Sequence, residues 1–268
     1  MPRSARWAGQ FYPGQSSALQ AEVDALVAAW PARRERPWAL IVPHAGYLYS
    51  GRTAAAAYAL VAGQDFRRVI LIGPAHHRAV ASFALSLRDP WQTPLGSVST
   101  DLAGARALLA AAPDAFALDD LALDLEHSLE VQVPFIQRCL PQALLLPILM
   151  GSASPQQRAR ARTCLQGIRR EEDLWVISSD LSHFHSRRQA ERLDAEAQRL
   201  IGEGRPGDLA DALRAGRVEA CGAGPLMLLL EEGEARSARL EVLDRSDSAA
   251  ASGDEDSVVG YLAAAAWE

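Results

Sequence analysis

The chain has 268 residues, of which 49% are hydrophobic, so it can bury a substantial core. Its formal net charge of −6 and its isoelectric point near 5.6 argue against a nucleic-acid partner and against a polybasic membrane patch. The sequence contains no Lys and no Asn, which excludes Schiff-base catalysis, a P-loop and a Cys-His-Asn triad.

No targeting or membrane segment is evident. No apolar run approaches the roughly 20 residues that span a bilayer, and residues 1–10 lack the apolar segment of a signal peptide. Three cysteines, an odd number, argue against a disulfide framework. We therefore expect a cytoplasmic protein. Because no linker or internal repeat divides the sequence, residues 1–268 are predicted to form a single domain.

The hydrophobic pattern alternates between helices and buried strands. After an irregular start, apolar residues at helical spacing predict a helix over residues 18–30, and a continuous apolar run predicts a buried strand over 38–42. Further helices are expected over residues 52–62, 102–111, 155–168, 187–202, 208–215 and 226–230. Further strands are expected over residues 67–72, 81–87, 143–150, 174–179, 238–243 and 258–264. This order predicts a three-layer α/β/α fold with a largely parallel central sheet.

Three stretches are less regular. Residues 91–96 form a predicted turn that leads into a short strand. Residues 126–136 have helical spacing apart from Pro134, which we expect to kink the helix. Residues 245–256, rich in Ser, Ala and Asp, are expected to form a mobile loop between two strands.

All the histidines lie at or beside the ends of predicted elements. They are His44, His76, His77, His127, His183 and His185. Three of their sites directly follow a predicted buried strand, and the carboxyl ends of parallel strands converge on one crevice in an open α/β sheet. A single histidine there is as often an ordinary hydrogen-bonded residue. Several converging imidazoles favour metal ligation or proton transfer.

One cysteine has surroundings that favour reactivity. Glycines and then the amino end of a predicted helix follow Cys221, and the positive end of a helix favours thiolate. That position suits a metal ligand or a nucleophile. Cys139 and Cys164 lie within helical, partly apolar stretches and are expected to be inert.

Carboxylates accompany two of the histidines. Glu126 precedes His127, and Asp180 lies three residues before His183. Such pairs suit orientation of an imidazole or acid–base work, and the simpler alternative for each is a helix cap or an ion pair. The spacing matches no zinc finger, no His-Glu-x-x-His and no Gly-x-Ser-x-Gly motif. The residues alone therefore indicate a crevice of imidazoles, carboxylates and one thiol, without a named reaction.

Five motifs occur in the order seen in the Memo family. They are Pro-His-Ala-Gly-Tyr-x-Tyr-Ser-Gly at 43–51, Gly-Pro-Ala-His-His at 73–77, Glu-His-Ser-Leu-Glu-Val-Gln-x-Pro-Phe at 126–135, Ser-Ser-Asp-Leu-Ser-His at 178–183 and Cys-Gly at 221–222. The resemblance extends from Trp-Ala-Gly-x-Phe-Tyr-Pro at 7–13 to Asp-Ser-Val-x-Gly-Tyr at 256–261. Among bacterial proteins, the chain is similar to the AmmeMemoRadiSam system protein B type.

The resemblance implies a fold like that of the class III non-haem iron extradiol dioxygenases and a site that carries an iron or copper ion. By motif position, the implied metal ligands are His44, one of His76 and His77, and Cys221. The sequence leaves open which of the two adjacent histidines faces inward. A thiolate ligand, in place of the carboxylate of those dioxygenases, shifts metal preference toward copper(I) and other thiophilic ions.

The same motif positions imply further residues around the ion. Asp180 and His183 are expected to line the pocket as catalytic residues. The other expected pocket residues are Tyr47, Glu126 and His127.

Three functions remain open from the sequence. The first is a metal-dependent redox enzyme in which His183 acts as acid or base and Asp180 orients it. The second is a binding module that retains a dioxygenase-like pocket and recognises a peptide or protein partner from the AmmeMemoRadiSam system. Its basis is a predicted aromatic collar of Trp7, Tyr12, Tyr47 and Tyr49. The third is a hydrolase with Cys221 as nucleophile, assisted by His183 and Asp180.

Overall fold

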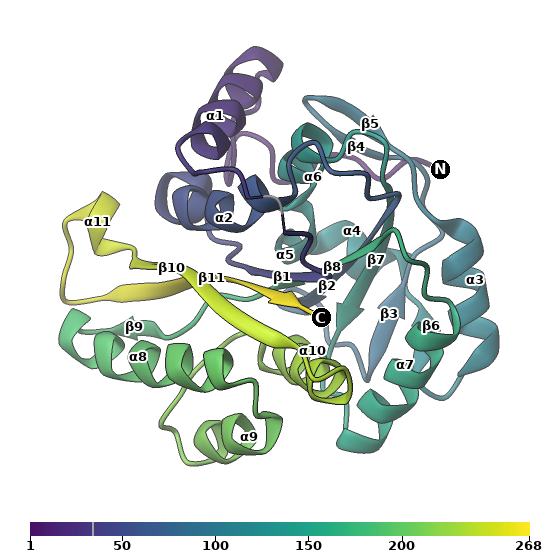
Figure 1. The fold of residues 1–268 in the computed structure, drawn as a ribbon. Coiled ribbons are helices and arrows are strands. Elements are labelled where there is room, and N and C mark those ends of the chain that lie inside the picture. Colours follow the sequence, from purple (N-terminus) through teal and green to yellow (C-terminus); the bar gives the residue numbers. More distant parts are fainter. Residues whose placement is uncertain (34) are drawn as a thin grey trace.

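The computed structural model describes residues 1–33 and 35–268, and a nine-stranded sheet runs through its centre (Figure 1). The strands of this sheet are β1 (Ala39–Val42), β2 (Arg68–Pro74), β3 (Phe83–Leu85), β6 (Phe116–Leu118), β7 (Leu144–Met150), β8 (Asp173–Ser178), β9 (His183–His185), β10 (Arg239–Asp247) and β11 (Val258–Trp267). Their order is β10-β11-β1-β8-β2-β7-β3-β6, and β9 pairs with β11. Strands β4 (Trp91–Thr93) and β5 (Gly96–Val98) form a separate hairpin.

The centre of the sheet is parallel and its flanks are partly antiparallel. Strand β8 pairs in parallel with both β1 and β2, and β2 pairs in parallel with β7. Antiparallel pairs join β11 to β1, β10 to β11 and β3 to β7. The expected mixed α/β fold with a largely parallel sheet is therefore confirmed. The loops that leave β1, β8 and β2 consequently open on one edge.

Helices cover both faces of the sheet. They are α1 (Ser16–Ala28), α2 (Tyr47–Val61), α3 (Leu102–Ala111), α4 (Asp120–Leu125), α5 (His127–Glu130), α6 (Val133–Cys139), α7 (Pro155–Gly167), α8 (Arg187–Glu203), α9 (Pro206–Arg214), α10 (Ala223–Ala235) and α11 (Ala249–Ser252). Helices α1, α2 and α6 pack on one face, and α3, α7, α8, α9 and α10 pack on the other (Figure 1).

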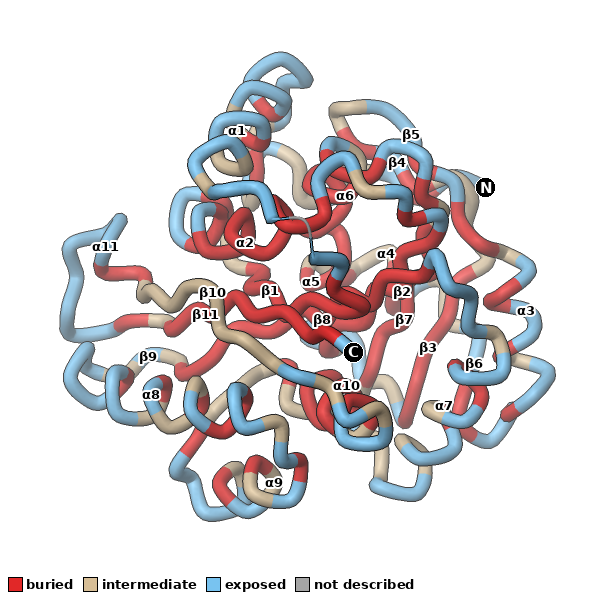
Figure 2. The backbone as a smooth tube through the Cα atoms, viewed as in Figure 1, coloured by how far each residue is buried: buried red, intermediate tan, exposed pale blue. Residues whose placement is uncertain are grey.

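The central strands are buried on both faces, as their uninterrupted apolar runs indicated (Figure 2). Successive side chains of a strand point to opposite faces. In β1, Leu40 and Val42 join one hydrophobic cluster, whereas Ala39 and Ile41 join the other. The sheet therefore separates two apolar layers, and each layer has its own set of helices.

Three local predictions were wrong. Helix α2 begins at Tyr47 rather than at residue 52, so the loop after β1 is short. Pro134 does not kink a continuous helix: it lies in the first turn of α6, where a missing N–H costs no hydrogen bond. Residues 245–256 do not form one continuous loop, because β10 continues to Asp247, which pairs with Gly260, and α11 follows. The start of α6 at Pro134 and the extension of β10 depend on contacts that local composition does not encode.

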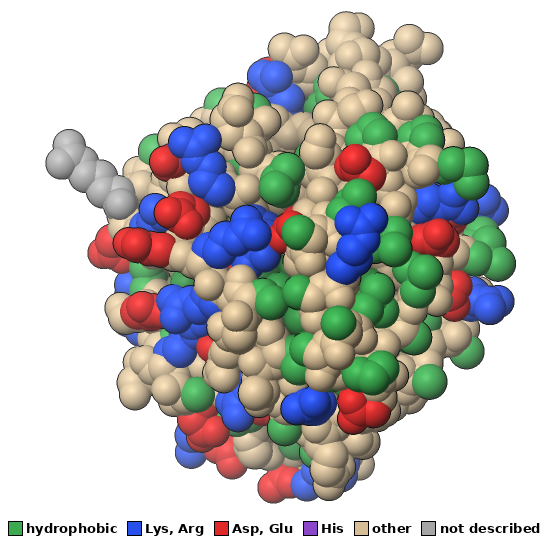
Figure 3. Space-filling view, turned by 90° about the vertical axis from the view of Figure 1, so that its right-hand side faces the viewer, with side chains coloured by type: hydrophobic (Ala, Val, Ile, Leu, Met, Phe, Trp, Pro, Cys, Tyr) green, Lys and Arg blue, Asp and Glu red, His purple; other side chains and the backbone are tan. Residues whose placement is uncertain are grey.

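The described part of the chain contains no helix that is both long enough and apolar enough to cross a membrane. On the flank drawn in Figure 3, Arg side chains lie beside Asp and Glu side chains instead of forming a uniform basic patch. This mixture agrees with the many surface ion pairs of the structure, such as Arg138 with Asp24.

A buried arginine joins the amino ends of two central strands. Arg68 begins β2 and is only 1% exposed. Its guanidinium lies 2.5 Å from the carboxylate of Asp173, the first residue of β8, and 2.7 Å from that of Asp101. Buried charges are tolerated only when they are paired in this way. The network lies at the sheet edge opposite to the loops that follow β1, β2 and β8.

Asp173→Asn should therefore lower the free energy of unfolding by about 3–5 kcal/mol, because it leaves the buried Arg68 partly uncompensated. Urea denaturation measures this change. Arg138→Ala, which removes the exposed pair with Asp24, is the control and should cost about 1 kcal/mol or less. Equal losses in the two variants would contradict the structural role of the Arg68 network.

Candidate metal centre and its pocket

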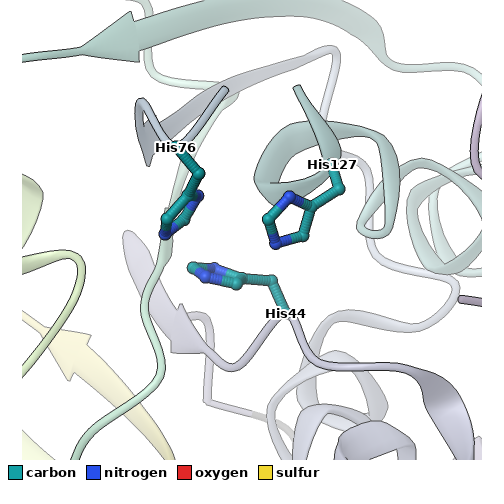
Figure 4. Close-up of side chains that lie close together, drawn as sticks. All are labelled: His44, His76 and His127. Atoms are coloured by element: carbon teal, nitrogen blue, oxygen red, sulfur yellow. The ribbon is translucent and has the colours of Figure 1, made fainter. Parts of the chain in front are cut away.

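Three histidines from separate segments meet at the carboxyl edge of the sheet. His44 follows β1, His76 follows β2, and His127 opens α5. One nitrogen of each ring lies within 4.8 Å of the corresponding nitrogens of the other two. Figure 4 shows the three rings facing a common centre. The prediction that strand ends would gather histidines is confirmed for His44 and His76.

Glycine allows two of these segments to approach the sheet. A Cβ on Gly73 would lie 2.8 Å from Oγ of Ser128, so only glycine lets α5 pack against the end of β2. A Cβ on Gly222 would lie 2.5 Å from Cβ of Ser179, so glycine also lets the Cys221 loop reach the end of β8. Both glycines belong to motifs singled out in the sequence.

The hydrogen bonds of Ser178 fix the tautomer of His44. The single hydroxyl proton of Ser178 goes to the carbonyl oxygen of Ser128 at 2.8 Å, since a carbonyl can only accept. Nδ1 of His44 lies 2.7 Å from the same Oγ and must therefore be the donor. Nε2 of His44 is left with its lone pair. Burial, followed by the nearby His127 and His76, lowers the pKa of His44 and keeps this ring neutral, as ligation requires.

A buried carboxylate holds the second histidine. Oε1 of Glu126 lies 2.9 Å from Nδ1 of His76, and Oε2 accepts the backbone N–H of His76 at 2.7 Å. Oε1 also accepts the backbone N–H groups of His127 and Ser128, both at 3.1 Å. Burial alone would raise the pKa of Glu126, but hydrogen bonds from His127 and His76 outweigh it and lower the pKa well below its usual range. An ionised Glu126 requires a proton on Nδ1 of His76, which frees Nε2.

The third ring connects the centre to the adjacent histidine. Nδ1 of His127 lies 2.9 Å from Nε2 of His77 and 3.2 Å from Oε1 of Glu126. A proton on Nδ1 can be donated to either acceptor and leaves Nε2 of His127 for the centre. His77 belongs to a second, outer group with Glu126 and His127. Of the two adjacent histidines, His76 is therefore the one grouped with His44.

Cys221 lies on another side of the same imidazole. Its Sγ is 3.2 Å from Nε2 of His44 and accepts the backbone N–H of Asp180 at 3.2 Å. Burial, and then the Asp180 carboxylate, raise the pKa of the thiol. This shift disfavours a free thiolate nucleophile, whereas a bound cation would deprotonate the thiol directly. Cys221, expected as the third ligand, is not a member of the three-imidazole group, in which His127 supplies the third nitrogen.

A pocket of about 480 Å³ opens in front of the centre. His127, Asp180 and His183 form part of its wall. Nδ1 of His183 lies 2.8 Å from the carbonyl oxygen of Leu181, which can only accept, so Nδ1 is the donor and the neutral imidazole has its lone pair on Nε2.

Two expectations about the pocket are altered by the structure. Asp180 does not orient His183 among the described residues, because Leu181 does so, and Asp180 accepts the backbone N–H of His44 at 2.7 Å instead. Tyr47 is buried and donates its hydroxyl to the carbonyl of Val131, since α2 already begins at this residue. Tyr49, two residues after Tyr47, and Phe11 from the amino-terminal segment line the pocket.

The amino-terminal segment forms an outer layer over the histidines, and Trp7 of the predicted aromatic collar belongs to it. The Trp7 ring stacks on His77 with centroids 4.9 Å apart, and Phe11 lies 4.8 Å from His127. The carboxylate of Glu130, fully buried in α5, anchors this segment. It accepts hydrogen bonds from Nη1 of Arg3, the backbone N–H groups of Arg6 and Trp7, and the hydroxyl of Tyr12. The only available signal for the role of Glu130 was the spacing of Glu126 and Glu130 in one motif.

Glu126→Gln should weaken metal binding about 10- to 100-fold, the usual effect of removing a carboxylate that orients a ligating histidine. An amide NH₂ in place of either oxygen would face N–H donors. Competition with a chelator for cobalt(II) measures the affinity. The matched control is Glu219→Gln, since that carboxylate contacts His185 outside the centre and should not affect binding. Unchanged affinity in Glu126→Gln would contradict this role.

Glu130→Gln should loosen the amino-terminal segment, because an amide nitrogen would meet donors where the carboxylate accepts four hydrogen bonds. Hydrogen exchange of residues 3–12 should become faster. Asp173→Asn is the control, since it breaks a comparable buried arginine pair at the opposite edge and should leave residues 3–12 protected. Equal exchange in wild type and Glu130→Gln would count against the anchor.

Comparison with known proteins agrees with the motif resemblance. The family model for Memo-like proteins matches residues 3–265. A MEMO1 family protein of Methanosarcina mazei is 32% identical over 261 residues, which cover 96% of each chain. One from Aquifex aeolicus is 34% identical over 262 residues, which cover 95% of each chain. One from Archaeoglobus fulgidus is 32% identical over 264 residues, which cover 97% of each. The chain belongs to the Memo family.

Proposed function

We propose that this protein is a metal-dependent redox enzyme whose ion is held by His44, His76 and further donors from His127 and Cys221. The convergence of the three imidazoles carries the proposal. Nδ1 of each ring has a hydrogen-bond partner that leaves Nε2 available, which is the arrangement that metal-ligating histidines generally have. A cluster of core histidines without a ligand role would not need to turn one nitrogen of each ring toward a common centre.

The donor set fits iron or copper. Neutral imidazoles suit both metals, and a thiolate from Cys221 would favour copper(I). An ion of either metal would supply one-electron redox chemistry at this position. Two ligand sets are possible for the proposed ion. Both contain His44 and His76, and the third ligand is either the imidazole of His127 or the soft sulfur of Cys221.

The protein's own residues have separate tasks around the ion. His183 lines the pocket with Nδ1 as donor to Leu181, and Nε2 of the neutral ring can accept a proton from a bound molecule. Burial raises the pKa of Asp180, whose carboxyl group positions the backbone of His44. Trp7 and Phe11 cover the outer side of the histidines and limit access of water from that direction.

Elemental analysis of untagged protein purified without oxygen tests the proposal. We expect near-stoichiometric iron or copper in the wild type and in His185→Ala, whose imidazole contacts Glu219 instead of the centre. His44→Ala and His76→Ala should each lose the metal. Cys221→Ser should lose copper selectively if sulfur is a donor, and His127→Ala should lower the affinity if the third imidazole is one.

Wild-type protein that contains no metal, and that cannot be loaded with iron(II) or copper(I), would contradict this function. Metal retained in both His44→Ala and His76→Ala would contradict the site. Oxygen or peroxide consumption, absent in the metal-free variants, would extend the result from binding to redox chemistry.

A second candidate function is recognition of a peptide or protein partner from the AmmeMemoRadiSam system. It is favoured by exposed apolar side chains near the pocket: Phe184 is 75% exposed, Leu48 73% and Tyr49 41%. Interfaces are rich in such anchors. A partner captured by wild type and by Cys221→Ala, but lost in Phe184→Ala, would favour this function over the enzyme.

A further inference from the structure

The walls of the pocket combine aromatic rings with hydroxyl groups. Phe11, Tyr49, Phe184 and Tyr261 reach it from four different segments of the chain. Ser248, Ser252 and Ser257 also line it. Its volume of about 480 Å³ is within the range of pockets that bind small molecules.

The charges of the wall have one sign. Asp180 and Asp254 line the pocket, whereas no Arg lines it among the residues that the structure describes, and the sequence has no Lys. Arg187, which lies close by in the fold, is paired with Asp247 and Glu255. An anionic group in the outer part of the pocket would therefore meet the exposed carboxylate of Asp254 without a compensating protein cation.

Phe184 is presented to the pocket by an unusual backbone. Its φ is +59°, a left-handed conformation that bulky residues rarely adopt, and its side chain is 75% exposed. The flanking residues are fixed on both sides, since His183 contacts the carbonyl of Leu181 and His185 contacts Glu219. Strain of this kind persists where surrounding contacts impose it, typically at ligand sites.

We propose that the pocket binds a small organic ammonium compound, with its cationic nitrogen among the aromatic rings and Asp254 and the rest of the molecule toward His127 and His183. Aromatic faces attract cations, and rings combined with a carboxylate are the usual means of recognising ammonium groups. Hydroxyl oxygens of the serines can accept its N–H hydrogen bonds. The inference rests on the proposed function in taking this pocket as the ligand pocket of the metal centre.

Three phenols that differ mainly in the charge of their side chain test this selectivity. Tyramine is the cation, 4-ethylphenol the neutral analogue and 3-(4-hydroxyphenyl)propionate the anion. Calorimetry on the full-length protein should show tyramine binding about 3- to 10-fold more tightly than 4-ethylphenol, from one partly exposed charge pair plus the cation–π contacts. The anion should bind more weakly than 4-ethylphenol in metal-free protein, where no metal ion can attract its carboxylate.

Two variants assign the preference to residues. Asp254→Asn keeps the oxygen that accepts the backbone N–H of Asp256, and it should reduce the advantage of tyramine about 2- to 5-fold while leaving 4-ethylphenol unchanged. Phe184→Ala should weaken both ligands. Asp114→Asn, in the turn after α3 and outside the lining of the pocket, is the charge control and should change neither.

Equal or tighter binding of the anion to metal-free protein would overturn the proposal, as would an unchanged tyramine preference in Asp254→Asn. Absence of binding by all three compounds at millimolar concentration would overturn it too. Metal content measured on each sample keeps the two proposals separate. If the protein prefers tyramine but cannot bind a metal, only the proposed enzyme is refuted. If the centre binds a metal but the protein does not prefer tyramine, only the ammonium site is refuted.

Discussion

The site depends on one buried carboxylate. Glu126 accepts hydrogen bonds from the backbone of the His76 loop, from the imidazole of His76 and from the amino end of α5, so it joins two segments that are 50 residues apart. Desolvation of this charge is unfavourable, and the hydrogen bonds outweigh it, as the lowered pKa shows. Without that charge, neither the orientation of His76 nor the position of His127 would be determined. The positions of the histidines therefore depend on the charge of Glu126 as well as on side-chain packing.

The two edges of the parallel sheet have different roles. At the amino edge, Arg68 joins β2 to β8 through ion pairs that contribute stability. At the carboxyl edge, the same strands lead to His76, which belongs to the histidine cluster, and to Asp180, which lines the pocket. This division follows from the geometry of parallel strands, whose loops alternate between edges. Residues of the site and residues of the Arg68 network can therefore be substituted independently. The matched variants at the two edges use this separation.

The sequence predicted the parts of this structure that local pattern controls. Apolar runs identified the central strands, and His44 and His76 were expected at their ends. The grouping of His127 with them, and the role of Leu181 in orienting His183, depend on loop geometry that no spacing rule contains. Glu130 was missed because its four donors come from residues more than 100 positions away. The motifs were recognised from the resemblance to the Memo family, whereas the tautomers of the site histidines follow from hydrogen bonds between residues that are far apart in the sequence.

Helix α5 is a single turn, yet it carries the contacts that unite the site. Glu126 precedes it and holds the His76 loop, His127 opens it and faces the centre, and Glu130 ends it and holds the amino-terminal segment. An isolated turn of this length is unstable in water. Its conformation must therefore be stabilised by the two carboxylates and by the packing of Leu129 in the core. It follows that the outer aromatic layer and the inner histidines are one cooperative unit: a change that releases residues 3–12 also removes a constraint on the ring of His127.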